Sequence, residues 1–267
     1  MENFTLLISN VEHSTSVMQN ASAKHDAHNE ENIELLFARS DVKQTLKSTK
    51  DLFIFSYSKI ENKEALIEKF NLQDIESDSD LISKLFNIIG NEVFLMLRGP
   101  FSTIIYDRVN NCVYASSDHN NIYPIYYSMG KKGVTFVSDP RLLYIHKALK
   151  KELDEEILFD YLVSGLPRES RTIYKNVMHV SGSSFIHIFN NFKKIKIEKY
   201  FEFKSEYKTA SYSTQQTKDI FLRTISSKLS MVGQNIATLL SGGLDSSSIT
   251  SAIDYLNKHK KLNKRIH

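Results

Sequence analysis

A glycine-rich loop between an apolar segment and a helical pattern constrains this chain more than any other feature. The apolar segment NIATLL occupies residues 235–240, the loop SGGLDS occupies residues 241–246, and SSSITSAIDYLNKHKK begins at the last residue of the loop. The spacing of apolar residues predicts a short buried strand for the first segment and a helix for the last. A strand, a glycine loop and a helix in succession are typical of an α/β nucleotide-binding fold.

The loop has the chemistry to hold a phosphate group. Its glycines allow positive φ angles and a close approach of the backbone to an anion. The amides at the start of the next helix point outward, and the helix dipole favours negative charge there. Ser241 and Ser246 add hydroxyl donors. Asp245 would repel an anion, so we expect it to orient the loop or to help place a Mg²⁺ ion indirectly, and we assign no metal ligand.

Other loop classes fit this segment less well. The pattern is neither the GxxxxGK[ST] loop nor the dinucleotide-binding GxGxxG. The alternative is a tight strand-to-helix turn that needs only glycine and a helix cap.

The residues before 205 predict a mixed, β-rich domain. We expect a strand at 52–58 and helices at 61–70 and 79–89. A polar loop is expected over residues 10–32, and a polar linker around 205–213. We also expect helices over 214–229 and at PRLLYIHKAL and DEEILFDYLVSG. Five short β-rich runs predict an antiparallel meander: EVFLML, FSTIIYD, CVYASSD, PIYYSM and VTFVSD. A further hairpin is expected at SSFIHIFN and KKIKIEKYF.

Composition excludes several classes. One cysteine among 267 residues cannot form an intramolecular disulfide or a cysteine-based zinc site. No apolar run approaches 18 residues, no signal peptide is recognisable, and a net charge of +3 does not imply nucleic acid. We therefore expect a cytoplasmic protein that binds neither nucleic acid nor a membrane. The cationic residues near the C-terminus are read as a solvated helix end, His13, His25 and His28 are given no role, and Tyr123, Tyr126 and Tyr127 are expected to pack in the core.

The loop and the order of motifs before it resemble the asparagine synthetase family. SGGLDS matches the pyrophosphate loop (PP-loop) of ATP pyrophosphatases, and LLSGGLDSSSI looks like the asparagine synthetase branch. LRGPFSTIIYD is similar to that family's LDGxFAFxxYD, ASSDHNNIYPIYY to its ARDxxGxxPLYY, and FVSDPRLL to its FASExKAL.

This resemblance implies two domains. Residues 1–205 would form a glutaminase-type (class II amidotransferase) α+β domain with an Ntn-hydrolase-like α-β-β-α sandwich. Residues 206–267 would form the incomplete beginning of an α/β PP-loop domain of the adenine nucleotide α-hydrolase type. The resemblance implies ATP and Mg²⁺ as cofactors, and it assigns nucleotide binding to Leu240, Ser241, Gly242, Gly243, Asp245 and Ser246.

Glutamine hydrolysis is not expected. The family uses a cysteine exposed by removal of the initiator Met, whereas Glu2 stands at that position here, and a carboxylate cannot replace a thiolate in acyl transfer. Cys112 lies in a predicted strand, where it is read as a small buried hydrophobe. The family's glutamine-binding RGPD segment has no clear counterpart.

The resemblance then favours the branch of β-lactam synthetases and lasso-peptide cyclases over asparagine biosynthesis. These ligases activate a carboxylate as an acyl-adenylate, release pyrophosphate and let an amine attack. The substrate would be a small-molecule or peptide carboxylate, and catalytic residues stay unassigned.

The ATP-binding domain is expected to be incomplete, because the chain ends 21 residues after Ser246 and a single parallel strand lacks a ladder partner. A fragment, a truncated gene product, or a second polypeptide that completes the synthetase domain would each explain this. We expect little ligase activity from the chain alone. The alternative function is an inactive remnant that serves as a binding module.

Overall fold

The computed structural model describes residues 4–9, 25–30, 33–38, 44–130, 133–145, 152–165, 170–202, 213–260 and 264–267. The chain divides into two compact units, Met1–Phe203 and Lys204–His267. Most of the linker expected around 205–213 lies outside the described residues. Within the described part, no helix is long and apolar enough to cross a membrane.

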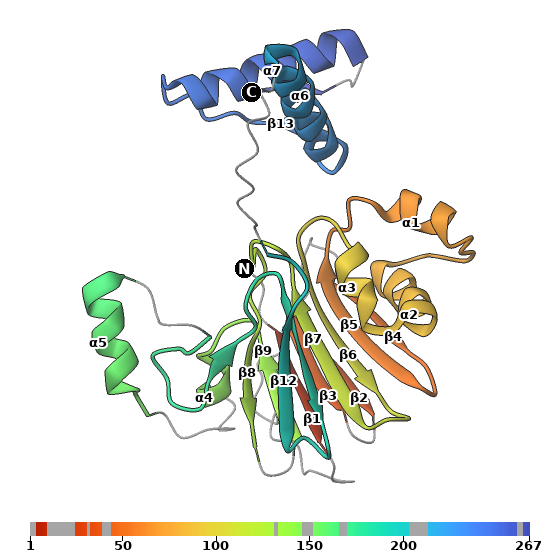
Figure 1. Cartoon of the computed structure of the whole chain (residues 1–267), viewed down its shortest axis with the longest axis vertical. Coiled ribbons are helices and arrows are strands. Elements are labelled where there is room, and N and C mark those ends of the chain that lie inside the picture. The colour runs from red at the N-terminus through yellow and green to blue at the C-terminus, as the bar shows by residue number, and fades with distance from the viewer. Residues whose placement is uncertain are drawn as a thin grey trace. The chain divides into compact units, whose positions relative to one another are not determined.

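The first unit contains two six-stranded antiparallel sheets (Figure 1). One sheet has the order β10 (Met178–His179), β8 (Tyr126–Met129), β9 (Gly133–Val137), β1 (Phe4–Ser9), β3 (Ile33–Ala38) and β2 (His25–Glu30). The other has the order β12 (Lys194–Lys199), β11 (Ser184–Phe189), β7 (Cys112–Ser117), β6 (Phe101–Asp107), β5 (Leu52–Ser58) and β4 (Gln44–Ser48). The prediction of a single antiparallel meander from the short β-rich runs was wrong: β6 and β7 form a hairpin in one sheet, and β8 and β9 form a hairpin in the other.

The main core lies between the two sheets. Phe4 of β1 packs against Phe55 of β5, with ring centroids 4.7 Å apart and the rings tilted by 54°. Side chains alternate along β5, so Phe53 and Phe55 face the other sheet while Ile54 faces the helices. Burial on both faces explains why β5 reads as an almost continuous apolar run.

Helices cover the outer face of the second sheet (Figure 1). They are α1 (Lys63–Lys69), α2 (Asp78–Ile89) and α3 (Val93–Met96), with the 3₁₀ turn Gly90–Glu92 between the last two. On the first sheet, α4 (Leu142–Ile145) contributes Leu143 to a small cluster with Val137 and Val177. α5 (Glu155–Ser164) ends at Gly165, which has φ +76°. The described part of the chain therefore confirms an α+β domain. On the outer face of the first sheet, the helix that packs within this part is α4, whereas the expected α-β-β-α sandwich has a full helical layer there.

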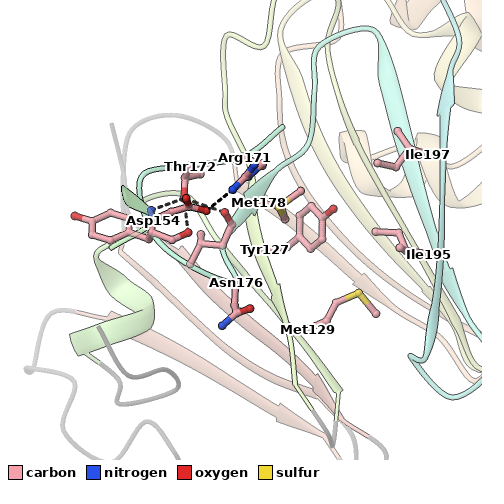
Figure 2. Close-up of a pocket in the computed structure, with 11 residues that line it drawn as sticks. Tyr127, Met129, Asp154, Arg171, Thr172, Asn176, Met178, Ile195 and Ile197 are labelled. Carbon is pink, nitrogen blue, oxygen red and sulfur yellow. Dashed lines mark hydrogen bonds and ion pairs between the residues drawn. The ribbon is translucent and has the colours of Figure 1, made fainter. Parts of the chain in front are cut away.

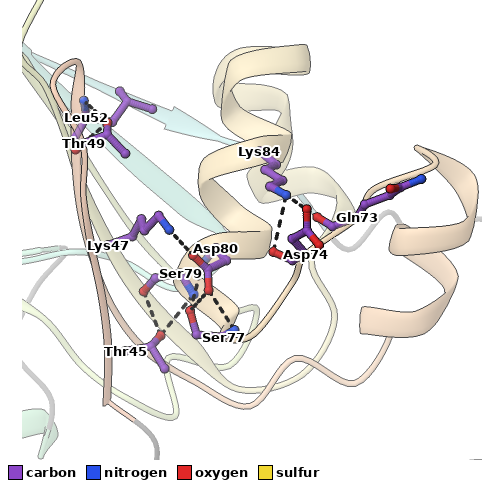
Figure 3. Close-up of polar contacts among 10 residues, drawn as sticks. All are labelled: Thr45, Lys47, Thr49, Leu52, Gln73, Asp74, Ser77, Ser79, Asp80 and Lys84. Carbon is purple, nitrogen blue, oxygen red and sulfur yellow. Dashed lines mark hydrogen bonds and ion pairs between the residues drawn. The ribbon is translucent and has the colours of Figure 1, made fainter.

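Polar contacts fix the start of α2 against β4 (Figure 3). Ser77 and Asp80 form a capping box: Ser77 Oγ accepts from the Asp80 amide at 3.1 Å, and Asp80 Oδ2 accepts from the Ser77 amide at 3.0 Å. Lys47 Nζ of β4 lies 2.7 Å from Asp80 Oδ1. Thr45 Oγ1 accepts from the Ser79 amide at 3.1 Å. These bonds attach the helical layer to an edge strand.

Replacing Asp80 with alanine should lower the free energy of unfolding at pH 7 by about 1–2 kcal/mol, because the cap and a charge-assisted bond are lost together. Burial would raise the pKa of Asp80, but the hydrogen bonds from Lys47 and Ser77 outweigh it and hold that pKa below its ordinary 3.8. The stabilisation is therefore present above pH 3.8 and lost as the pH falls through the folded-state pKa. Urea titrations at pH 7 and pH 3 check this, with exposed Glu64→Ala as control; an equal difference at both pH values would contradict it.

Two local predictions for the first unit were wrong. Residues 25–30, expected in a loop, form β2, which pairs with β3 in register His25↔Ala38; the ladder with an apolar neighbour outweighs the polar composition of β2. EVFLML, expected as a strand, forms the end of the 3₁₀ turn and α3. Its buried residues Val93, Phe94 and Leu97 have helical spacing, and short apolar runs are ambiguous between strand and helix.

The second unit contains α6 (Thr214–Ser230), β13 (Asn235–Ile236), α7 (Leu244–Lys260) and β14 (Arg265–Ile266). β13 and β14 pair in parallel through two residues each, and α7 connects them. Leu229 of α6 packs with Ile253 and Leu256 of α7 in a small core. The buried strand expected over 235–240 is shorter than predicted, because its ladder ends at residue 236 and leaves Leu239 and Leu240 92% and 63% exposed.

Candidate functional site

The residues of the SGGLDS segment lie at the start of α7. The helix begins at Leu244, so Asp245 and Ser246 belong to its first turn and the preceding serine and glycines form the loop. Gly242 has φ +80°, a region that L-residues with a side chain rarely adopt. Glycine is therefore required by the backbone at this point.

The two serines of the loop come together. Ser241 Oγ lies 3.0 Å from Ser246 Oγ, and the Ser241 amide donates to Ser246 Oγ at 3.3 Å. Ser246 Oγ also donates to the Gly243 carbonyl at 3.2 Å, which closes the loop on itself. All of these residues except half-buried Ser246 are exposed, so two hydroxyls and the first amides of α7 lie together next to solvent. This arrangement favours an anionic group.

Leu240 and Asp245 occupy the two ends of the segment. Leu240 precedes the loop and is exposed. Asp245 is exposed in the first turn of α7, where a carboxylate is favoured by the helix dipole. Among the described residues no group of three or more His, Cys, Asp or Glu side chains is arranged to hold a metal ion. A metal here would need ligands beyond those that these residues supply.

A cavity next to the loop adds residues that the sequence analysis did not select. It has a volume of about 810 Å³ and lies between the first halves of α6 and α7. Its wall includes Lys218, Phe221 and Asp245. Lys218 Nζ lies 5.5 Å from the centre of the Tyr255 ring, so the ammonium group is held against the second half of α7. Only a tertiary contact between the helices brings Lys218 there, and nothing in the local pattern of α6 marks it.

Cys112 is the single cysteine of the sequence, and its environment is unsuited to a nucleophile. It is buried at the start of β7 and paired with Asp107 in the ladder with β6. Burial, with the nearby Asp107 carboxylate, raises the pKa of the thiol to about 11. At neutral pH the reactive thiolate is therefore almost absent. The interpretation of Cys112 as a buried hydrophobe is consistent with this position.

The three tyrosines named in the sequence analysis make packing contacts. Tyr127 is buried in the main core, Tyr126 is half-buried beside α4, and Tyr123 meets Tyr57 edge to face at 4.2 Å. His13 lies outside the described residues.

The fold and the loop define an α+β protein that combines a double antiparallel sheet with a strand–glycine loop–helix unit. A family model, the glutamine amidotransferase domain, matches residues 41–201, which is more than half of the chain. The chain belongs to this glutamine amidotransferase family, and the resemblance to asparagine synthetases is confirmed over roughly its first 220 residues.

Curated relatives include glutamine-hydrolysing asparagine synthetases. A Methanocaldococcus jannaschii protein assigned as asparagine synthetase 2 is 25% identical over 221 residues, covering 79% of this chain and 42% of the relative. Bacillus subtilis asparagine synthetase 1 is 26% identical over 203 residues, covering 73% and 31%. The chain thus spans less than half the length of these relatives.

Two solved structures that match the chain do so with TM-scores below 0.5. The glutamine phosphoribosylpyrophosphate amidotransferase of B. subtilis matches with a TM-score of 0.47 and 12% identity, covering all of this chain and 59% of its own. A glutamine aminotransferase class-II domain protein of Silicibacter pomeroyi matches with a TM-score of 0.41 and 9% identity, covering 74% and 99%.

Proposed function

We propose that this chain takes part in ATP-dependent amide-bond formation of the asparagine synthetase type. A carboxylate is activated as an acyl-adenylate with release of pyrophosphate, and an amine attacks it, without glutamine hydrolysis by this chain. The substrate class is a small-molecule or peptide carboxylate. The observation that carries the proposal is the convergence of Ser241, Ser246 and the start of α7 in one exposed loop, with Ser241 Oγ and Ser246 Oγ 3.0 Å apart.

The loop fits the pyrophosphate end of ATP. Glycine at 242 meets no atom within 4 Å of an added Cβ, so a ligand has room to approach the backbone. Ser241, Gly243 and Ser246 would supply hydroxyl and amide donors to the phosphates, with Leu240 contacting the nucleotide from the side. Mg²⁺ would neutralise phosphate charge when bound, with Asp245 orienting the loop beside it. Lys218 adds a cation to the wall of the cavity that Asp245 also lines.

Completion of the ATP-binding unit by further parallel strands, from a longer form of this chain or from a second polypeptide, is part of this proposal. β13 and β14 form a parallel sheet of two residues per strand, whereas parallel sheets are stable as buried layers of several strands. Leu239 and Leu240 are exposed beside this short ladder. Added parallel strands would bury them. Without these strands the chain would bind nucleotide but convert little substrate. The alternative is that it acts only as a binding module.

Glutamine hydrolysis is a second candidate, favoured by the amidotransferase family match over residues 41–201. Catalysis of this kind needs an activated nucleophile, usually a thiolate for amide transfer. The chain's own thiol, Cys112, is buried and has a pKa raised to about 11. We therefore favour the ligase reaction with an amine already present in the substrate.

Ammonia release from L-glutamine separates the two candidates. We expect the purified chain to release no more ammonia than a buffer blank, and Cys112→Ala to leave the result unchanged. Release that is removed by Cys112→Ala would assign hydrolysis to this thiol. Release that persists in the variant would show hydrolysis by another group, and either result would contradict the proposal.

A further inference from the structure

A second cavity lies in the first unit, at the open edge between its two sheets (Figure 2). Its volume is about 380 Å³, within the range of small-molecule sites. One wall comes from β8 and β10, and the facing wall comes from Ile195 and Ile197 of β12. Both β10 and β12 are edge strands of their sheets. The cavity therefore extends the core between the sheets toward solvent.

The lining is mainly apolar. Met129 and Met178 are partly buried against the main core, and Ile195 and Ile197 are 38% and 51% exposed. Ile195 pairs with Ile188 and Ile197 with Ile186, so both isoleucines lie on the core-facing side of β12. Ile195 and Ile197 are therefore exposed because they line the cavity, and not because they lie on the solvent-facing side of β12. An apolar ligand would remove these side chains from water.

One hydroxyl in the lining is available as a hydrogen-bond donor. Tyr127 is 3% exposed, and its side chain extends from β8 toward Ile195 and Ile197 (Figure 2). Within the described residues its hydroxyl makes no hydrogen bond; its ring contacts Phe136, at 6.3 Å between centroids. The hydroxyl lies at the cavity and is not one of the fully buried polar atoms without a partner, so a ligand acceptor would take the place of water at this donor. Burial raises the pKa of Tyr127 to about 12, so the hydroxyl stays protonated and donates.

The charged groups at the rim are already paired. Arg171 donates to Asp154 at 2.6 Å and to Glu156 at 3.0 Å. Thr172 donates to the carbonyls of Tyr174 and Val177. A charged ligand would have to compete with these pairs, whereas a neutral one would leave them intact.

We propose that this cavity binds a small, neutral, largely aliphatic molecule with one acceptor oxygen, held by a hydrogen bond from the Tyr127 hydroxyl. The aliphatic part lies against Met129, Met178, Ile195 and Ile197. The lining residues all belong to the first unit, and the proposal does not depend on the proposed ligase reaction.

Hexanamide is a suitable probe because it has an aliphatic tail and one carbonyl acceptor. We expect its titration into the full chain, labelled at the methyl groups of methionine and isoleucine, to shift the resonances of Met129, Met178, Ile195 and Ile197 in a saturable way. The resonance of Met96, in the helical layer, should stay unchanged. The absence of saturable shifts, or equal shifts at Met96, would overturn the proposal.

Variants test the hydrogen bond and the wall separately. Tyr127→Phe should weaken hexanamide binding about fivefold, since it removes one hydrogen bond and keeps the ring. Tyr126→Phe, on the neighbouring residue, should not. Ile197→Ala, at an exposed edge position, should weaken binding without threatening the fold. Equal affinity in Tyr127→Phe and the unmodified chain would overturn the proposed contact, and hexanoate binding as tightly as hexanamide would overturn the neutral class.

Discussion

Gly99→Ala is expected to lower the free energy of unfolding of the first unit by about 3 kcal/mol. Gly99 lies between α3 and β6 with φ +104°, where any side chain is strained. A Cβ there would lie 2.3 Å from the Lys59 carbonyl oxygen and 2.8 Å from Glu61 Cγ. The backbone bonds Lys59 N–Pro100 O and Glu61 N–Arg98 O close this turn, so it has little freedom to relax.

Urea unfolding followed by circular dichroism measures this loss. The matched control is Gly130→Ala, also in a turn of the same unit. A Cβ at Gly130 would meet its nearest neighbour, the Gly133 carbonyl, at 3.7 Å, and its backbone is outside the left-handed region. We expect the control to change stability by less than about 0.5 kcal/mol. Equal losses in the two variants would show that the close approach at Gly99 carries no special cost.

Gly242→Val should weaken Mg²⁺-dependent ATP binding by more than about tenfold. A β-branched residue is strongly disfavoured at φ +80°, so the loop backbone must change. The change would move the amides and the Ser241–Ser246 pair that we propose to hold the phosphates. Because nothing lies within 4 Å of an added Cβ, the loss should come from backbone conformation and not from a clash.

Gly233→Val is the matched control for this variant. Gly233 lies in the same unit, between α6 and β13, also with no atom near an added Cβ and without a positive φ. It should leave ATP affinity within about twofold of the unmodified chain. Isothermal titration calorimetry of both variants makes the comparison. Unchanged affinity in Gly242→Val would exclude the loop backbone as the phosphate contact.

The elements with strong periodicity were predictable from the sequence. The pattern LFIFSYS predicted β5, and SDLISKLFNII predicted α2 to within one residue, because each has an unambiguous apolar spacing. β2 and α3 were missed for the opposite reason. The polar β2 is a strand only because it pairs with β3, and the short run in α3 takes its conformation from the core it packs against.

The candidate site was predictable only in part. The loop residues are contiguous, so sequence alone places Ser241 and Ser246 at one strand-to-helix junction. Lys218 is distant in sequence and reaches the cavity beside Asp245 through the packing of α6 on α7. Tyr127 was correctly expected in the core, but no pattern indicates that it also lines a cavity. Such features depend on tertiary contacts that local periodicity does not record.

Calorimetric titration of ATP into the purified chain, with Mg²⁺ and then with excess chelator, tests the central claim most directly. We expect saturable binding with one site per chain in the presence of Mg²⁺ and a loss of at least tenfold in affinity without it, since the metal offsets the repulsion between Asp245 and the phosphates. The absence of saturable binding in Mg²⁺ would contradict the assignment of the SGGLDS segment as a nucleotide loop.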